Sequence, residues 1–179
     1  MKTQASKLWL LAVIATLFVP AFAFAQSGDN DGCSNATLSG DYAFRVSGQV
    51  YPPVPQGAPP VVLQRDGVAM THFDGAGKLT QVDFIMSNGV AMMGPADPLT
   101  GFHVGETGWY QVFPDCTGRA EIHFPVPPTG TSGAIIDLKF VLSNQGRTIH
   151  TIVSSLTPPN QTTPIPASIH SDAEKLGQE

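Results

Sequence analysis

The chain has 179 residues, a formal net charge of −5 and a charged-residue content of 13%, about half the roughly 25% of average globular proteins. Its 18 glycines and 16 prolines disfavour helical bundles and coiled coils, because both residues interrupt helices. The sequence has no block of Lys and Arg, which argues against a nucleic-acid partner bound through its phosphates.

The first 25 residues have the three parts of a secretory signal peptide. Lys2 and Lys7 precede an apolar run at 8–19, and an Ala-x-Ala pattern ends at Ala25. The run is too short to cross a hydrocarbon core of about 30 Å. A buried core helix is the alternative, but the run has no polar pattern on its other face. We predict a signal peptide at 1–25 and a mature protein that is secreted or periplasmic, with no membrane association after cleavage.

Two cysteines, Cys33 and Cys116, follow the signal peptide. An even number of cysteines in an exported chain predicts a disulfide. A reactive thiol is the alternative, but neither cysteine has a neighbouring His or a second Cys at C-x-x-C spacing. We therefore predict a structural bridge between them, closing a loop of about 84 residues.

Turn-forming residues divide the mature chain into about eight runs of alternating polarity, the pattern of half-buried strands. The runs are 42–47, 61–74, 81–86, 89–93, 106–113, 119–124, 136–142 and 147–156. Short turns between successive strands favour an all-β, antiparallel up-and-down barrel, because closure removes exposed sheet edges. A β-sandwich is the alternative. We place the barrel domain at 26–157 and a polar C-terminal tail at 158–179, which either frays or carries a short helix or strand near 167–176.

Several motifs carry a family resemblance. They are Cys33, LSGDYAF at 38–44, FDGAG at 73–77, GWY at 108–110 and DCTG at 115–118. Together they resemble a group of small secreted bacterial proteins without an assigned function. At fold level the chain is similar to calycin and allene-oxide-cyclase-like barrels, which implies eight strands. Lipocalins begin their first strand with G-x-W, where this chain has Tyr42, so no ligand-binding residue is carried over from them.

Metal-binding and catalytic patterns are weak. The five histidines form no H-E-x-x-H motif and no close Cys/His group, so we predict no metal and no cofactor. His103 and Glu106 are three residues apart, a spacing that pairs side chains on a helix rather than on a strand. Glu121 and His123 share one strand face and could meet His150, but we interpret them as part of the polar solvent face.

Nucleophilic catalysis also lacks a clear signal, because the sequence has no G-x-S-x-G elbow. The most aromatic stretch contains Trp109, Tyr110 and Phe113. These residues could line the mouth of a ligand site, but we interpret them as closing the core of a small barrel.

Alternation sends a set of apolar side chains into the predicted barrel, which is of a size that can hold one small ligand. The candidate ligand-binding residues are Phe44, Val46, Phe84, Met86, Ile122, Phe124, Leu138 and Phe140. We predict an exported barrel that binds a small apolar ligand or a protein partner. The alternatives are an isomerase- or cyclase-type enzyme and a structural or interaction module with a solid core. A cavity, and an inward polar group within it, would separate these hypotheses.

Overall fold

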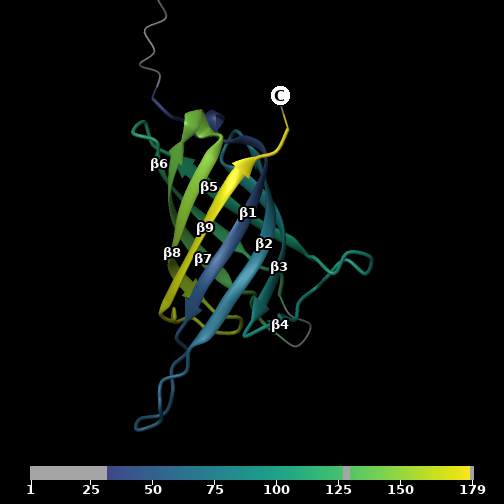
Figure 1. Ribbon diagram of the computed structural model, residues 1–179, viewed down its shortest axis with the longest axis vertical. Helices are drawn as coiled ribbons and strands as arrows, with labels where there is room; N and C mark the ends of the chain where they lie inside the picture. Colours follow the sequence, from purple (N-terminus) through teal and green to yellow (C-terminus); the bar gives the residue numbers. More distant parts are fainter. Residues whose placement is uncertain (1–31, 127–129, 178–179) are drawn as a thin grey trace, which may run out of the picture. The chain divides into compact units, whose positions relative to one another are not determined.

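The computed structural model describes residues 32–126 and 130–177, so the predicted signal peptide lies outside the described residues. Over the described ranges the chain forms nine strands and two 3-10 turns, η1 and η2 (Figure 1). The strands are β1 Ser39–Val50, β2 Leu63–Asp74, β3 Lys78–Ser87, β4 Val90–Ala91, β5 His103–Val112, β6 Thr117–His123, β7 Ile135–Ser143, β8 Thr148–Thr157 and β9 Ala167–Lys175. Neither 3-10 turn, and no other helix in these ranges, is long and apolar enough to span a membrane.

Eight of the strands in the described ranges close into an antiparallel barrel. β1 lies between β2 and β9, and the order continues through β8, β7, β6 and β5 to β3. Pairing of β2 with β3 closes the ring. The two-residue β4 lies outside the barrel and pairs with the end of β3. The predicted up-and-down barrel is confirmed, and the sandwich alternative is wrong.

The alternation of side chains along each strand separates an interior face from a solvent face. On β7, Leu138 and Phe140 face the interior, whereas Lys139 and Val141 are exposed. On β1, Phe44 and the residues two positions away on either side face the interior in the same way. These positions agree with the period-2 pattern in the sequence.

The C-terminal boundary of the barrel differs from the prediction. Residues Ala167–Lys175 were placed in a polar tail for which a short strand was one alternative; they form β9, which pairs with both β1 and β8 and so belongs to the barrel. Its inward residues Ile169, Ser171 and Ala173 are buried. Because two of these three side chains are small and one is polar, they give a weak alternation signal. The strand predicted at 89–93 is only the outer β4, and β9 is the eighth strand of the barrel.

The two ends of the barrel have different connections. At the closed end the turns are short, at 75–77, 113–116 and 144–147. At the mouth the connections between barrel strands are longer: they are 51–62, 88–102, 158–166 and 124–134, the last described only at 124–126 and 130–134. One end therefore has little chain beyond the strands, and the other is surrounded by loops.

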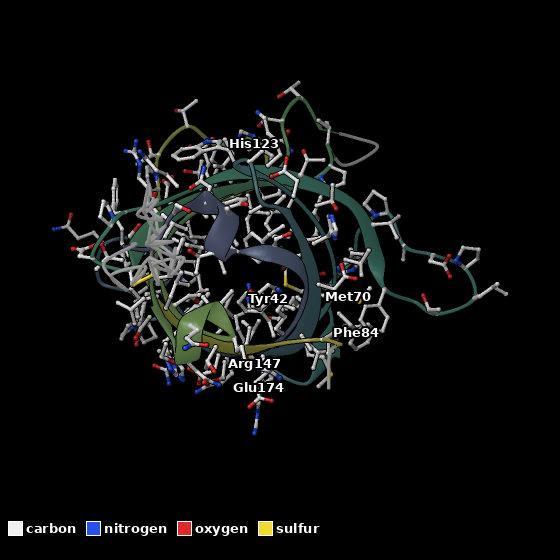
Figure 2. All side chains as sticks on the ribbon, turned by 90° about the horizontal axis from the view of Figure 1, so that it is seen from above. Tyr42, Met70, Phe84, His123, Arg147 and Glu174 are labelled. Carbon is white, nitrogen blue, oxygen red and sulfur yellow. A yellow bond between two sulfur atoms is a disulfide. The ribbon has the colours of Figure 1, made fainter. Side chains whose placement is uncertain are left out.

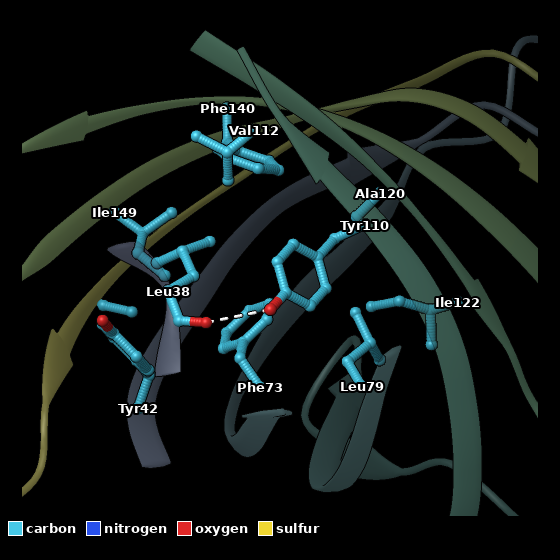
Figure 3. Packing of buried hydrophobic residues seen from close by; sticks show 11 residues of the cluster. Leu38, Tyr42, Phe73, Leu79, Tyr110, Val112, Ala120, Ile122, Phe140 and Ile149 are labelled. Atoms are coloured by element: carbon cyan, nitrogen blue, oxygen red, sulfur yellow. Dashed lines mark hydrogen bonds between the residues drawn. The ribbon is translucent and has the colours of Figure 1, made fainter. Parts of the chain in front are cut away.

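Aromatic side chains fill the closed end (Figure 3). The Phe73 ring lies edge-on to the rings of Tyr42 and Tyr110, with centroid separations of 5.4 and 5.0 Å. The Tyr110 hydroxyl donates to the Leu38 carbonyl over 2.9 Å, and the Tyr42 hydroxyl donates to the Gly146 carbonyl over 2.6 Å. These hydrogen bonds satisfy polar atoms that would otherwise be costly to bury. Tyr110, one of the three aromatic residues expected to close the core, is therefore part of it.

The predicted disulfide is confirmed. Cys33 and Cys116 are bonded, and their Cα atoms are 4.9 Å apart. The Cys33 amide also donates to the Pro114 carbonyl over 3.2 Å. The bridge therefore ties the segment before β1 to the β5–β6 turn at the closed end.

Candidate functional site

The barrel encloses a cavity of about 460 Å³, within the range of roughly 300–1,000 Å³ usual for small-molecule sites. All eight barrel strands contribute to its wall. The lining extends from Leu38 and Phe73 near the closed end to Pro52, Met93 and Pro159 in the connections at the mouth. Met93 is 99% exposed, so the cavity reaches the surface at the mouth.

Six of the eight candidate ligand-binding residues line this cavity. They are Phe44, Val46, Ile122, Phe124, Leu138 and Phe140. The other two, Phe84 and Met86 on β3, were expected inside, but they lie on the opposite face of the strand. Figure 2 shows Phe84 outside the ring of strands, whereas Tyr42 lies within it.

The inward face of β3 is formed instead by Leu79, Gln81, Asp83 and Ile85. The Phe84 ring packs outside the barrel against Phe102 of the 88–102 connection, with a centroid separation of 6.1 Å. That contact shields the outward ring from water. The two inward polar side chains are kept because hydrogen bonds satisfy them. A choice of the inward face of β3 by apolarity alone therefore selects the face that lies outside the barrel.

Hydrogen bonds connect the inward polar residues of β2, β3 and β5. The Thr71 hydroxyl donates to Gln81 Oε1 over 2.7 Å, and Gln81 Nε2 donates to Glu106 Oε2 over 2.7 Å. Asp83 Oδ1 lies 2.8 Å from His103 Nδ1. His103 Nε2 lies 3.0 Å from the Met92 carbonyl oxygen, to which it donates. A polar network thus borders an otherwise apolar cavity.

A β-bulge brings His103 and Glu106 to the same face of β5. Gln81 pairs with Glu106 and Asp83 pairs with His103, so two steps on β3 oppose three steps on β5. The extra residue reverses the expected alternation. Gly105 lies between the two side chains with φ +86°, a backbone region that glycine adopts without steric penalty. The glycine inside the H-x-x-E spacing is the sequence signal for this arrangement.

The carboxyl groups of this network are strongly perturbed by burial. Asp83 and Glu106 are 2% and 1% exposed. Burial raises the pKa of Asp83, and the hydrogen bond with His103 opposes the rise. Burial first, and then the charge of Asp83, raise the pKa of Glu106 to about 8. Glu106 therefore keeps its proton at pH 7 in the metal-free protein.

Asp83, His103 and Glu106 also form a cluster that could hold a cation. Each offers one ligand atom, and these atoms lie within 4.8 Å of one another. The Glu106 Oε1 atom is enclosed and has no hydrogen-bond partner among the described residues. The sequence interpretation missed this cluster because it assumed regular alternation along β5.

The other candidate polar groups lie on the outer surface. His123 Nε2 is 2.5 Å from Glu121 Oε1, and both side chains are partly exposed. His150 pairs with Asp172 over 2.6 Å instead of joining them. Trp109 also faces outward and donates to Glu121 Oε1 over 3.1 Å. Glu121 and His123 thus form part of the polar solvent face, as expected, and Figure 2 shows His123 outside the barrel. The core role expected for Trp109 is wrong, because its ring lies on the outer face with Glu121 and Arg119.

In comparisons with known proteins, neither a family model nor a curated protein matches the chain.

Proposed function

We propose that this protein is an exported carrier that binds one small apolar molecule inside its barrel. The cavity of about 460 Å³ carries this proposal, because a solid core would leave no room for a ligand. Its wall is mainly aliphatic and aromatic, so an apolar ligand gains about 25 cal/mol per Å² of surface removed from water.

Two further observations fit a carrier outside the cytoplasm. Three of the four mouth connections, 51–62, 124–134 and 158–166, contain no charged residue, so an apolar molecule meets few charges on entry; Asp97 lies in the fourth connection, and Arg65 lines the cavity. The Cys33–Cys116 bridge suits the oxidising compartments to which exported proteins are delivered.

A single substitution in the cavity wall tests the proposal. Leu138→Trp adds bulk to the interior face of β7, and Val141→Trp adds the same side chain to the exposed face of that strand. We expect saturable binding of an uncharged solvatochromic dye by the wild type, at least tenfold weaker binding by Leu138→Trp, and affinity within twofold of wild type for Val141→Trp. Fluorescence titration measures all three.

Val46→Phe on β1 narrows the cavity with a smaller change and serves if Leu138→Trp folds poorly. Circular dichroism of each variant checks that the barrel forms. Absence of saturable binding by the wild type would contradict the carrier. Equal affinity of correctly folded Leu138→Trp and Val141→Trp would place the dye outside the cavity.

A second candidate function is an isomerase or cyclase, and one observation favours it. The protonated Glu106 carboxyl and His103 border the cavity, where an acid and a base could act on an enclosed apolar substrate. A ligand recovered from the native host and incubated with the protein would distinguish the two. An enzyme of this type changes the ligand's connectivity at constant mass, whereas a carrier returns it unchanged.

A further inference from the structure

We propose that Asp83, His103 and Glu106 bind one divalent transition-metal ion in the cavity wall, and that Zn²⁺ matches this ligand set. The three side chains come from the facing strands β3 and β5. Two carboxylates and one imidazole are ligand types that Zn²⁺ accepts readily. The proposal does not depend on the carrier function, because it rests on a different set of residues from the apolar wall.

The separations between the ligand atoms suit one ion. Bonds of about 2.0–2.2 Å from zinc to nitrogen or oxygen place neighbouring ligand atoms about 3–4 Å apart. Asp83 Oδ1 and His103 Nδ1 are 2.8 Å apart, and the three ligand atoms all lie within 4.8 Å of one another.

The orientation of His103 also fits metal binding. Its Nε2 donates to the Met92 carbonyl over 3.0 Å, and its Nδ1 shares a proton with Asp83 Oδ1 over 2.8 Å, so an ion would replace that proton. A metal-bound histidine usually donates its second ring nitrogen to a carbonyl or carboxylate in this manner. The backbone of the 88–102 connection thus fixes the tautomer that a metal requires.

The Glu106 carboxyl supplies an independent observation. The residue is 1% exposed, and its Oε1 atom has no hydrogen-bond partner among the residues that the structure describes. Buried carboxyl oxygens without a partner are rare, because desolvation is costly. Gln81 holds the other oxygen, and Thr71 holds Gln81. One oxygen is fixed by this chain of hydrogen bonds, and the other faces Asp83, where an ion would replace the proton held between the two carboxyl groups.

Charge balance favours a doubly charged cation. Two carboxylates buried side by side are strongly unfavourable unless protons or a cation neutralise them. One divalent ion would leave the group of Asp83, Glu106 and neutral His103 without net charge. Since all three residues border the cavity, a remaining coordination position of the ion could face a bound ligand.

Exposed pairs on the same barrel provide matched controls. His72–Asp41, His123–Glu121 and His150–Asp172 each join an imidazole to a carboxylate at 2.5–2.8 Å, and all lie at the surface. The pair of His103 and Asp83 differs because both members are largely buried and a third ligand is present. Specific binding should therefore respond to His103 and not to His123.

The experiment uses the disulfide-intact protein stripped of metal with a chelator. We would titrate Zn²⁺ against a competing chelating indicator and measure bound zinc after equilibrium dialysis. We expect one tight zinc per wild-type chain, affinity at least 100-fold weaker for His103→Gln and Glu106→Gln, and unchanged affinity for His123→Gln. Zinc should also raise the Tm of the wild type and His123→Gln but not of the two site variants.

Glu106→Gln conserves volume and removes one carboxylate, so it keeps the test informative if His103→Gln fails to fold. Wild-type affinity no greater than that of folded Glu106→Gln would overturn the metal site. So would a loss of tight binding in His123→Gln alone. Either result leaves the carrier proposal standing, because uptake of an uncharged dye needs no ion.

Discussion

We expect the free energy of unfolding of the metal-free protein to fall by a few kcal/mol, on the order of 3–5, as the pH rises from about 5 to about 8.5. The main cause is Glu106, whose pKa is raised to about 8 by burial and by Asp83; burial also raises the pKa of Asp83, which acts in the same direction. Between its ordinary pKa and this raised value, the folded state holds a proton that the unfolded state has released. The stability that this carboxyl group contributes is therefore fully present below about pH 4.5 and is lost as the pH rises toward 8.

Glu106→Gln is the decisive variant, because glutamine has nearly the same shape and does not titrate. Its unfolding free energy should depend much less on pH over this interval and should exceed that of the wild type at pH 8.5. Urea titrations at fixed pH, with a chelator present, measure the difference. Equal pH dependence in the two proteins would show that Glu106 is ionised throughout.

Carboxyl groups with a lowered pKa affect the free energy of unfolding in a separate, more acidic pH range. Hydrogen bonds from backbone amides lower the pKa of Asp74 and Asp97, and hydrogen bonds from Thr117 lower that of Asp115. Stability from such groups is present above about pH 4 and is lost as the pH falls further. They do not titrate between pH 5 and 8.5, so they do not obscure the effect of Glu106. The most stable pH for the metal-free protein should therefore lie near 5.

Removal of the disulfide should lower the free energy of unfolding by about as much as the ionisation of Glu106 does. Replacement of both Cys33 and Cys116 by Ser frees a loop of about 84 residues in the unfolded chain, for which the chain-entropy relation gives about 4–5 kcal/mol of lost stability. The structure adds a local cause, because the bridge holds the 3-10 turn η1 (Asn35–Thr37) beside the aromatic packing of the closed end. Urea unfolding of the double variant at pH 5 measures the loss.

The barrel should still form in the double-Ser variant, because the strand pairings do not involve either cysteine. Far-ultraviolet circular dichroism should therefore keep its β-sheet signature. Wild-type protein reduced under native conditions provides a control with unchanged sequence. A loss below about 1 kcal/mol in both samples would contradict the loop-closure account.

Much of the fold could be predicted because turns and alternation are local properties. On β7 and β1, apolar side chains at every second position reach the interior, as the pattern in the sequence indicates. Strand β9 gave a weaker signal because Ser171 and Ala173 face inward. A strand held in place by pairing on both sides does not need large apolar side chains at every inward position.

The polar network could not be predicted from local pattern. On β3 the more apolar set containing Phe84 faces outward, because the 88–102 connection folds back and Phe102 covers it. The inward Asp83 is tolerated only because His103, distant in sequence, contacts it. Regular alternation would place His103 and Glu106 on opposite faces of β5, and the bulge at Gly105 places them on the same face. Long-range contacts and one backbone irregularity thus decide the chemistry of the cavity.

The separation of the barrel into a closed end and a mouth has a consequence for protein engineering. The disulfide, η1 and the aromatic packing all belong to the closed end, whereas a smaller apolar cluster of Val50, Val153 and Ile169 lies toward the mouth. The connections 51–62 and 158–166 contain no charged residue and lie between strands that the rest of the barrel holds in register. Residues 53–62 could be randomised to alter recognition, whereas in 158–166 Ile165 must be kept, because it packs against the second core cluster and its amide donates to the Leu156 carbonyl over 2.8 Å.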